Sequence, residues 1–304
     1  MALKSHNLLS ACIQLAARSG EIIKTVYSSG NLGTTDKGGD DPCTVADINS
    51  QILIQSSIEK YFPGVTVVGE EKVESSEDRV ASGLNFEAVP QGIIPEGLKE
   101  LEAQNITIWV DPLDGTKNFT LGDTLGVTTM IGIAYRGSPL FGVLHHVFSE
   151  GPSTYWGGGA LGVFRTEDPF GSYGSKLELS PCSDYSAVTT RLHSTPKMEE
   201  FIKNLHLDRC EYADGSGYKG ILVLTGQVSL YVFVEPWTKK WDTCAPEALL
   251  KSIGGGIYDL SGNSYSYFSD AEHINQNGII MCSSGLFVQN VLDEWNKFNM
   301  DSVN

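Results

Sequence analysis

Apolar and polar positions form two kinds of pattern along the chain. Near the N-terminus apolar residues recur at helical spacing, so that Leu8, Leu15 and Ile22 share one face of a helix predicted over about 5–28. Similar spacing predicts a second helix over about 44–61. Short apolar runs bounded by turn residues predict strands over about 65–68, 106–110, 127–135, 140–147 and a pair within 155–164.

The pattern changes beyond about residue 175, where predicted strands and helices alternate. Such alternation favours an α/β sheet with helices on its faces. We therefore expect an N-terminal α+β subdomain, residues 1–174, and a C-terminal α/β subdomain, residues 175–304. The strands are predicted over about 187–190, 209–213, 228–234 and 279–282, and the helices over about 196–205, 217–225, 243–253 and 285–297.

The strand predicted over 106–110 leads directly into a turn at residues 111–116. Pro112 has a fixed φ and no N–H, so we expect the strand to stop there. Gly115 permits the positive φ that would turn the chain back before a helix begins. The alternative is an ordinary turn in which Asp114 only caps that helix.

In this turn Asp111 and Asp114 would point into one small volume, with the carbonyl of Leu113 between them. Two anions so close repel each other unless a cation lies among them. Mg²⁺ takes oxygen ligands of this kind and usually keeps waters and substrate phosphates in the rest of its shell. The hydroxyl of Thr116 could orient one such water.

Other carboxylates stand at similar places in the chain. Glu70 and Glu71 follow the strand predicted over 65–68, at what we expect to be the rim of a sheet. Asp47 and Asp242 each stand near the start of a predicted helix. A carboxylate there also caps the helix or is stabilised by its dipole, so these two positions have ordinary structural explanations when taken alone.

Four segments together resemble the lithium-sensitive, Mg²⁺-dependent phosphomonoesterase superfamily. They are P-x-T-x-A-D at 42–47, G-E-E at 69–71, W-V-D-P-L-D-G-T at 109–116 and W-D-x-C-A-P-E at 241–247. The superfamily includes inositol monophosphatase, fructose 1,6-bisphosphatase, inositol polyphosphate 1-phosphatase and 3′(2′),5′-bisphosphate nucleotidase. The last segment most resembles the nucleotidase branch, since the polyphosphate phosphatases typically carry His where this chain has Glu247.

The resemblance implies a layered α-β-α-β-α sandwich and a site for two or three Mg²⁺ ions that is inhibited by Li⁺. By this resemblance Glu70, Asp111 and the carbonyl of Leu113 would hold one ion. Asp111, Asp114 and Asp242 would hold a second, with Asp111 bridging the two.

The resemblance also implies that Asp47 and Thr116 activate the attacking water, so that no covalent nucleophile is required. Glu71 would support the metal ligands from behind, with a plain surface carboxylate as the alternative. The polar insert over 72–105 is expected to form a loop or short helices near this site.

An acidic cleft needs basic and polar groups to hold the non-reacting end of an anionic substrate. Residues 190–193 precede a helix predicted to start near Thr195, and a helix N-terminus favours anions. Residues 215–220 resemble the nucleotidase turn that contacts adenosine 5′-phosphate, whereas Leu192 stands where the family commonly has a polar residue. A structural His193 and a merely flexible turn are the alternatives. By the resemblance, the substrate-binding residues are Gly115, Thr190, His193, Gly215 and Lys219.

We therefore expect an enzyme that hydrolyses the 3′-phosphate of adenosine 3′,5′-bisphosphate to give AMP and phosphate. By extension, it would act on the related sulfate-bearing nucleotide, 3′-phosphoadenosine 5′-phosphosulfate. One alternative is an inositol polyphosphate 1-phosphatase acting on inositol 1,4-bisphosphate. A more remote alternative is a non-catalytic protein that keeps the fold and binds metal or phosphate.

Composition excludes some classes of binding partner and some locations in the cell. A formal net charge of −16 argues against binding polymeric nucleic acid, whereas a small nucleotide stays compatible because bound Mg²⁺ inverts the local field. The six cysteines are scattered without a C-x-x-C pair, which predicts reduced thiols. No apolar run approaches the ~20 residues of a membrane span. We expect a cytoplasmic protein with a small phosphorylated substrate and favour a monomer.

Overall fold

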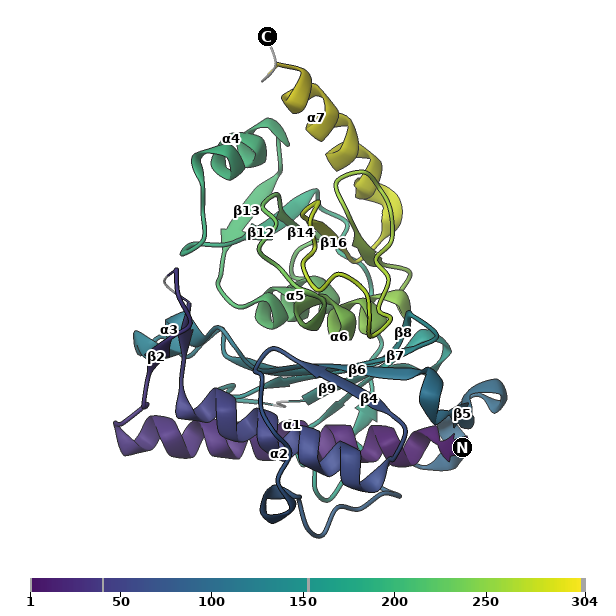
Figure 1. Ribbon diagram of the computed structural model, residues 1–304. Coiled ribbons are helices and arrows are strands. Elements are labelled where there is room, and N and C mark those ends of the chain that lie inside the picture. The colour runs from purple at the N-terminus through teal and green to yellow at the C-terminus, as the bar shows by residue number, and fades with distance from the viewer. Residues whose placement is uncertain (1, 40, 152–153, 302–304) are drawn as a thin grey trace.

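The computed structural model describes residues 2–39, 41–151 and 154–301, and its elements form five layers (Figure 1). The first layer consists of α1 (Ser5–Ser29) and α2 (Val45–Tyr61), which pack against one face of a seven-stranded sheet. Helices also lie between this sheet and a five-stranded sheet, and beyond the second sheet. This order confirms the predicted α-β-α-β-α sandwich.

The remaining helices occupy the middle and the last layers. The middle layer contains α5 (Ser216–Leu224) and α6 (Lys240–Lys251), and the last layer contains α4 (Pro196–Asn204) and α7 (Val288–Asp301). A short helix, α3 (Thr116–Thr120), follows the turn at residues 111–116. No helix within the described ranges is long and apolar enough to cross a membrane.

Two sheets contain most of the strands. The first has the order β11-β10-β9-β8-β7-β6-β4, and its strands are β4 (Thr66–Gly69), β6 (Ile106–Asp114), β7 (Thr128–Tyr135), β8 (Ser138–His146), β9 (Thr154–Gly158), β10 (Gly162–Thr166) and β11 (Ser175–Lys176). The second has the order β13-β12-β14-β16-β15, and its strands are β12 (Ser186–Thr189), β13 (Arg209–Tyr212), β14 (Leu230–Phe233), β15 (Gly256–Tyr258) and β16 (Ile279–Cys282). Two small ladders pair β1 (Ala2–Lys4) with β5 (Glu100–Glu102) and β2 (Thr35–Asp36) with β3 (Pro42–Cys43).

The strand β6 continues through Pro112, where the sequence predicted its end. Asp111 lies opposite Met130 of β7, and Asp114 lies opposite Thr128, so two residues of β6, Pro112 and Leu113, stand opposite one residue of β7. This is a β-bulge, and its extra residue is not needed for the ladder. On the other side of β6, the pairing with β4 ends at Val110 of β6, before the proline. The missing N–H of Pro112 therefore removes no hydrogen bond from the ladder with β4 or from the ladder with β7. The bulge is what allows a proline here.

Residues 72–105 confirm the predicted short helices but not their predicted place. Ala81, Val89, Ile94 and Leu101 are buried in the core cluster that α1 and α2 form with the first sheet. None of the residues 72–105, all of which are described, lines the cavity that contains the predicted site residues. The insert therefore covers the first layer instead of the site. Its 3₁₀ turns span Glu77–Arg79, Gln91–Ile93, Glu96–Leu98 and Ala103–Asn105.

Two predicted helix starts shift by about three residues. The helix predicted from 243 begins at Lys240, because the carboxylate of Asp242 accepts the backbone N–H of Lys239 at 2.6 Å and caps that end. The helix predicted from 285 begins at Val288 and follows a separate 3₁₀ turn over Gly285–Phe287.

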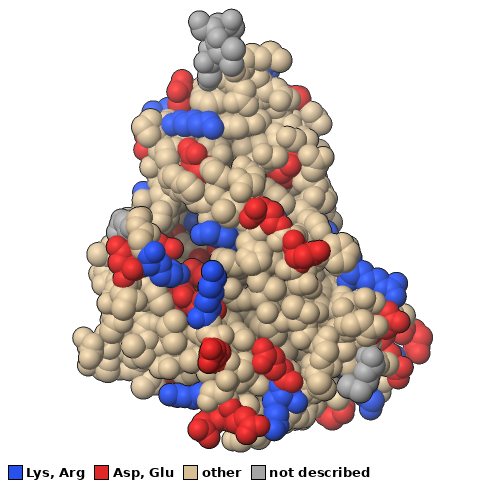
Figure 2. Space-filling view, viewed as in Figure 1, with Lys and Arg blue, Asp and Glu red and all other residues tan. Residues whose placement is uncertain are grey.

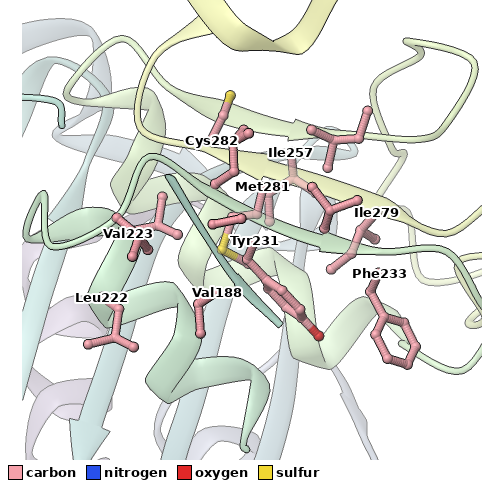
Figure 3. Packing of buried hydrophobic residues seen from close by; sticks show 14 of the residues in the cluster. Val188, Leu222, Val223, Tyr231, Phe233, Ile257, Ile279, Met281 and Cys282 are labelled. Atoms are coloured by element: carbon pink, nitrogen blue, oxygen red, sulfur yellow. The ribbon is translucent and has the colours of Figure 1, made fainter. Parts of the chain in front are cut away.

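The second hydrophobic core joins the middle layer to the five-stranded sheet. Tyr231 and Phe233 of β14 pack in one cluster with Val188 of β12 (Figure 3). Met130 and Leu144 from the first sheet belong to the same cluster, so the two halves of the chain are in apolar contact. The division into two subdomains stays a proposal, and β11 pairs with β10 across the boundary drawn from the sequence.

Candidate active site

A cavity of about 580 Å³ brings together residues from distant parts of the chain. Asp111 and Asp114 line it from β6, and Thr190, Lys219 and Asp242 line it from the second half. Figure 2 shows acidic side chains within a hollow on this face of the molecule, with basic side chains beside it. The cavity therefore joins the predicted metal residues to the predicted substrate residues.

Three carboxylates form the acidic centre of this cavity. Asp111, Asp114 and Asp242 each offer an oxygen that lies within 4.8 Å of the other two. Asp111 is 2% exposed, and its buried Oδ1 has no hydrogen-bond partner among the described residues. A buried carboxylate oxygen without a partner is costly unless a cation approaches it. This all-oxygen donor set fits a hard divalent cation such as Mg²⁺.

The pKa shifts in this carboxylate cluster also indicate a cation site. Burial and the nearby charge of Asp114 together raise the pKa of Asp242 to about 7. Burial raises the pKa of Glu70 to about 7 in spite of a neighbouring lysine. Burial and the charges of Glu70, Asp114 and Asp242 hold the pKa of Asp111 well above its usual range. Without a cation, the group retains protons near neutral pH that a bound cation would displace.

Asp114 is fixed by the first residues of α5. Its two carboxylate oxygens accept the backbone N–H groups of Ser216 at 3.0 Å and Gly217 at 2.8 Å. The hydroxyl of Thr128 donates to the same carboxylate at 3.1 Å. Gly215 precedes them with φ of 79°, and a Cβ there would lie 2.3 Å from the carbonyl oxygen of Gly126. Residue 215 must therefore be glycine for the backbone to adopt this conformation, whether or not it also contacts a substrate.

Asp47 and Thr116 lie next to each other beside the acidic centre. Oδ1 of Asp47 is 3.0 Å from the hydroxyl of Thr116, which is also 2.8 Å from the carbonyl oxygen of Leu113. Oδ2 of Asp47 accepts the backbone N–H of Thr44 and caps α2, so the capping explanation holds for one of its oxygens. Burial raises the pKa of Asp47 to about 6. The other oxygen remains directed toward Thr116.

Glu70 and Glu71 share a lysine that the sequence analysis did not single out. Lys37, between β2 and β3, places its ammonium 2.9 Å from Glu70 and 2.7 Å from Glu71. The backbone N–H of Glu70 donates to Val110, which holds Glu70 beside Asp111. Glu70 lines the cavity, whereas Glu71 is buried and outside its lining. No local pattern marks Lys37, since its contacts come from the fold alone.

The predicted substrate residues line the same cavity: Gly115, Thr190, His193, Gly215 and Lys219. Gly115 has φ of 84°, as predicted for the turn into α3. Lys219 is 4% exposed, and its ammonium lies 4.7 Å from the centre of the Tyr231 ring. Burial lowers the pKa of Lys219, while Asp114, Asp214 and Asp242 oppose that shift. A buried cation therefore lies among the acidic residues.

Two more cavity residues, Asp214 and Trp237, were not predicted from the sequence. Asp214 lies directly before Gly215, and Trp237 lies between β14 and α6; both line the cavity. Ligands in α/β sheets gather beyond the carboxyl ends of strands, and this rule could have drawn attention to Asp214 after β13 and to Trp237 after β14.

Comparison with known proteins identifies the family. The model of the inositol monophosphatase family matches residues 4–294. The chain belongs to the inositol monophosphatase family. It is 33% identical over 279 residues to 3′(2′),5′-bisphosphate nucleotidase 1 of Homo sapiens, covering 90% of this chain and 89% of that protein. The enzyme of the same name from Dictyostelium discoideum is 35% identical over 91% of this chain and 93% of its own.

The fold agrees with this membership. The structure of the extragenic suppressor protein suhB from Bartonella henselae aligns with a TM-score of 0.70 over 95% of this chain and 98% of that one, at 18% identity. In this member of the inositol monophosphatase family, Pro42, Glu70 and residues 111 and 113–116 line the cavity together with Trp241 and Asp242. All four segments that carried the resemblance thus meet at one place.

Proposed function

We propose that this member of the inositol monophosphatase family is a Mg²⁺-dependent phosphomonoesterase that hydrolyses the 3′-phosphate of adenosine 3′,5′-bisphosphate. The observation that carries the proposal is the meeting of Asp111, Asp114 and Asp242 with Thr190 and Lys219 in one cavity. Two relatives at 33% and 35% identity bear the name 3′(2′),5′-bisphosphate nucleotidase 1, which supports the choice of substrate. The proposal extends to 3′-phosphoadenosine 5′-phosphosulfate.

Glu70, Asp111 and the carbonyl of Leu113 would hold one Mg²⁺, and Asp111, Asp114 and Asp242 would hold a second. The buried Oδ1 of Asp111 supports a bridging role, because it lacks a hydrogen-bond partner among the described residues. When bound, such cations lower the pKa of a water and offset charge on the phosphoryl oxygens.

Asp47 and Thr116 would orient the attacking water and remove its proton. The hydroxyl of Thr116 has one proton, and it lies 3.0 Å from Oδ1 of Asp47. Thr116 can pass this proton to Asp47 while accepting one from the water, so Asp47 becomes neutral and the negative charge develops on the attacking oxygen. A pKa of about 6 suits Asp47 to accept a proton near neutral pH.

The other end of the substrate would lie against the second half of the chain. Lys219 supplies a buried positive charge to a cavity that Lys117 and Lys239 also line, as the 5′-phosphate of a bisphosphate requires. Thr190, His193, Gly115 and Gly215 complete the proposed contacts with the substrate.

The experiment that tests the proposal is phosphate release from adenosine 3′,5′-bisphosphate with Mg²⁺ and again with a chelator. We expect fast release that the chelator abolishes and that Li⁺ inhibits. Silence on the nucleotide with turnover of inositol 1,4-bisphosphate would favour the polyphosphate phosphatase alternative. Silence on both substrates, with Mg²⁺ binding in calorimetry, would favour the non-catalytic alternative.

A further inference from the structure

We propose that Trp237 is the residue that stacks on the nucleobase and gives this site its preference for a nucleotide over a polyol phosphate. This inference rests on the proposed function. Trp237 lines the cavity that contains the acidic centre. Its side chain is 47% exposed, which makes it the most exposed of the five tryptophans. Ligand pockets are lined predominantly by hydrophobic and aromatic side chains, so an exposed indole in the wall of this cavity is placed to contact a ligand.

The neighbours of Trp237 leave it available for stacking. Its ring lies 6.0 Å from that of Phe233 at an interplanar angle of 60°, and 6.4 Å from that of His193 at 74°. Both are edge contacts, so neither neighbour occupies the indole as a face-to-face partner. Phe233 and His193 line the cavity too, and Phe233 is rooted in the core of the five-stranded sheet (Figure 3). The three rings form an aromatic wall.

The segment that carries Trp237 is held on both sides. Before it, the hydroxyl of Thr195 at the start of α4 donates to the carboxylate of Glu235 at 2.7 Å. After it, Asn275 donates its backbone N–H to the carbonyl of Thr238 at 2.9 Å and its side-chain amide to the Thr238 hydroxyl at 3.1 Å. An exposed aromatic ring on an anchored segment loses little freedom when a ligand packs on it.

The chemistry of the wall selects the ligand. Phosphate groups belong at the carboxylate cluster, where cations would bind, and at Lys219, so the aromatic wall is left for an uncharged part of the substrate. A purine presents a flat π face, and base stacking on an aromatic side chain is tolerant of the base. A saturated inositol ring presents hydroxyl groups and has no such face. The wall therefore favours a nucleoside bisphosphate.

The test compares substrates with and without the base. Adenosine 3′,5′-bisphosphate would be measured beside methyl β-D-ribofuranoside 3,5-bisphosphate, which keeps the sugar and both phosphates. We expect W237A to raise KM for the nucleotide roughly 5- to 150-fold and to leave KM for the abasic compound within about twofold. W237F should retain most of the wild-type preference, whereas W237L, apolar without a π face, should behave like W237A. Equal effects on both substrates, or none, would overturn the proposal.

A binding measurement separates this inference from the proposed function. Titration of AMP followed by tryptophan fluorescence should quench the wild-type protein more than W237F, and W237A should bind AMP more weakly in calorimetry. If wild type hydrolyses neither substrate, the proposed function fails, and the AMP titration alone decides the stacking role. AMP binding that W237A leaves unchanged would overturn that role whether or not the protein is an enzyme.

Discussion

The hydroxyl of Thr190 donates a hydrogen bond to Oδ1 of Asp214 at 3.0 Å, and this contact joins the ends of β12 and β13 at the cavity. Asp214 is 3% exposed and also accepts the backbone N–H groups of Arg191 at 3.0 Å and Leu192 at 3.1 Å. Its other oxygen accepts Nε of Arg191 at 3.0 Å and Nδ2 of Asn118 at 3.2 Å. One carboxylate thus holds the segment that carries two proposed substrate contacts.

Removing this carboxylate should weaken substrate binding more than chemistry. In D214A, Thr190 and the N–H groups of the following residues lose their acceptor, while Asp111 and Asp242 keep their places. We expect KM for the nucleotide to rise about tenfold or more, with a smaller change in kcat, and stability to fall by roughly 1–3 kcal/mol. Steady-state kinetics and thermal melts check both. A fall in kcat at unchanged KM would contradict a positioning role.

Asp214 should also stabilise the fold in a pH-dependent way. Burial alone would raise its pKa, but hydrogen bonds from Leu192, Asn118 and Arg191 lower it from 3.8 to about 2. A depressed pKa in the folded state adds stability above pH ~4 that is lost as the pH falls through about 2, here about 2 kcal/mol.

The check is denaturant unfolding of wild type and D214N between pH 2 and 7. Wild type should be the more stable above pH 5, and the difference should shrink steadily below pH 4. A difference that stays constant across this range would show that Asp214 contributes through shape alone.

The sequence could predict the turn that follows β6 and the two carboxylates that it brings together. The turn at Gly115, the helix after it and the nearness of Asp111 to Asp114 follow from short-range rules on proline, glycine and strand ends. The bulge that carries β6 through Pro112 could not be predicted, because it depends on the register of β7. Local sequence rules therefore predict which residues form the turn. Where the strand ends depends instead on the strands with which it pairs.

Their places after β13 and β14 could have drawn attention to Asp214 and Trp237, but the contacts that Lys37 and Asp214 make could not be predicted, for the same reason. Lys37 meets Glu70 and Glu71 across more than thirty positions of sequence, and nothing around it indicates an acidic partner. Asp214 reads as an ordinary turn residue before Gly215 until β12 is placed beside β13. Their roles exist only in the folded chain, where segments without a common pattern meet.

Two neighbouring carboxylates should respond to substitution in opposite ways when metal is absent. Asp114 accepts three hydrogen bonds, so D114A should lower the stability of the chelator-treated protein by roughly 1–3 kcal/mol. Asp111 has a buried oxygen without a described partner and lies among like charges, so D111A should leave that stability unchanged or raise it. Both variants should lose about a thousandfold or more in turnover with Mg²⁺.

Chelator-treated melts and phosphate-release assays measure these effects on the same samples. D111N is the matched control, since it keeps the size of the side chain but removes its charge. A D111A protein that retains half its activity with Mg²⁺ would remove Asp111 from the proposed metal ligands.

Binding of Mg²⁺ should release protons, and its affinity should therefore depend on pH. Burial raises the pKa values of Glu70 and Asp242 to about 7, so near neutrality part of the carboxylate cluster is protonated when no cation is present. A cation binds the ionised carboxylates, so its apparent affinity should fall as the pH drops from about 8 to 6. At pH 7 the carboxyl groups of Glu70 and Asp242 are each about half protonated when no cation is present. Binding of Mg²⁺ that ionises both should therefore release about one proton.

Calorimetric titration of Mg²⁺ at pH 7 in two buffers with different ionisation enthalpies measures this release directly. The apparent heat should differ between the buffers in proportion to the protons taken up. The D242N variant should release fewer protons than wild type, because one of the two groups that titrate near pH 7 is gone. Equal heats in both buffers would show that the carboxylates are already ionised without metal, and that some other positive group balances them.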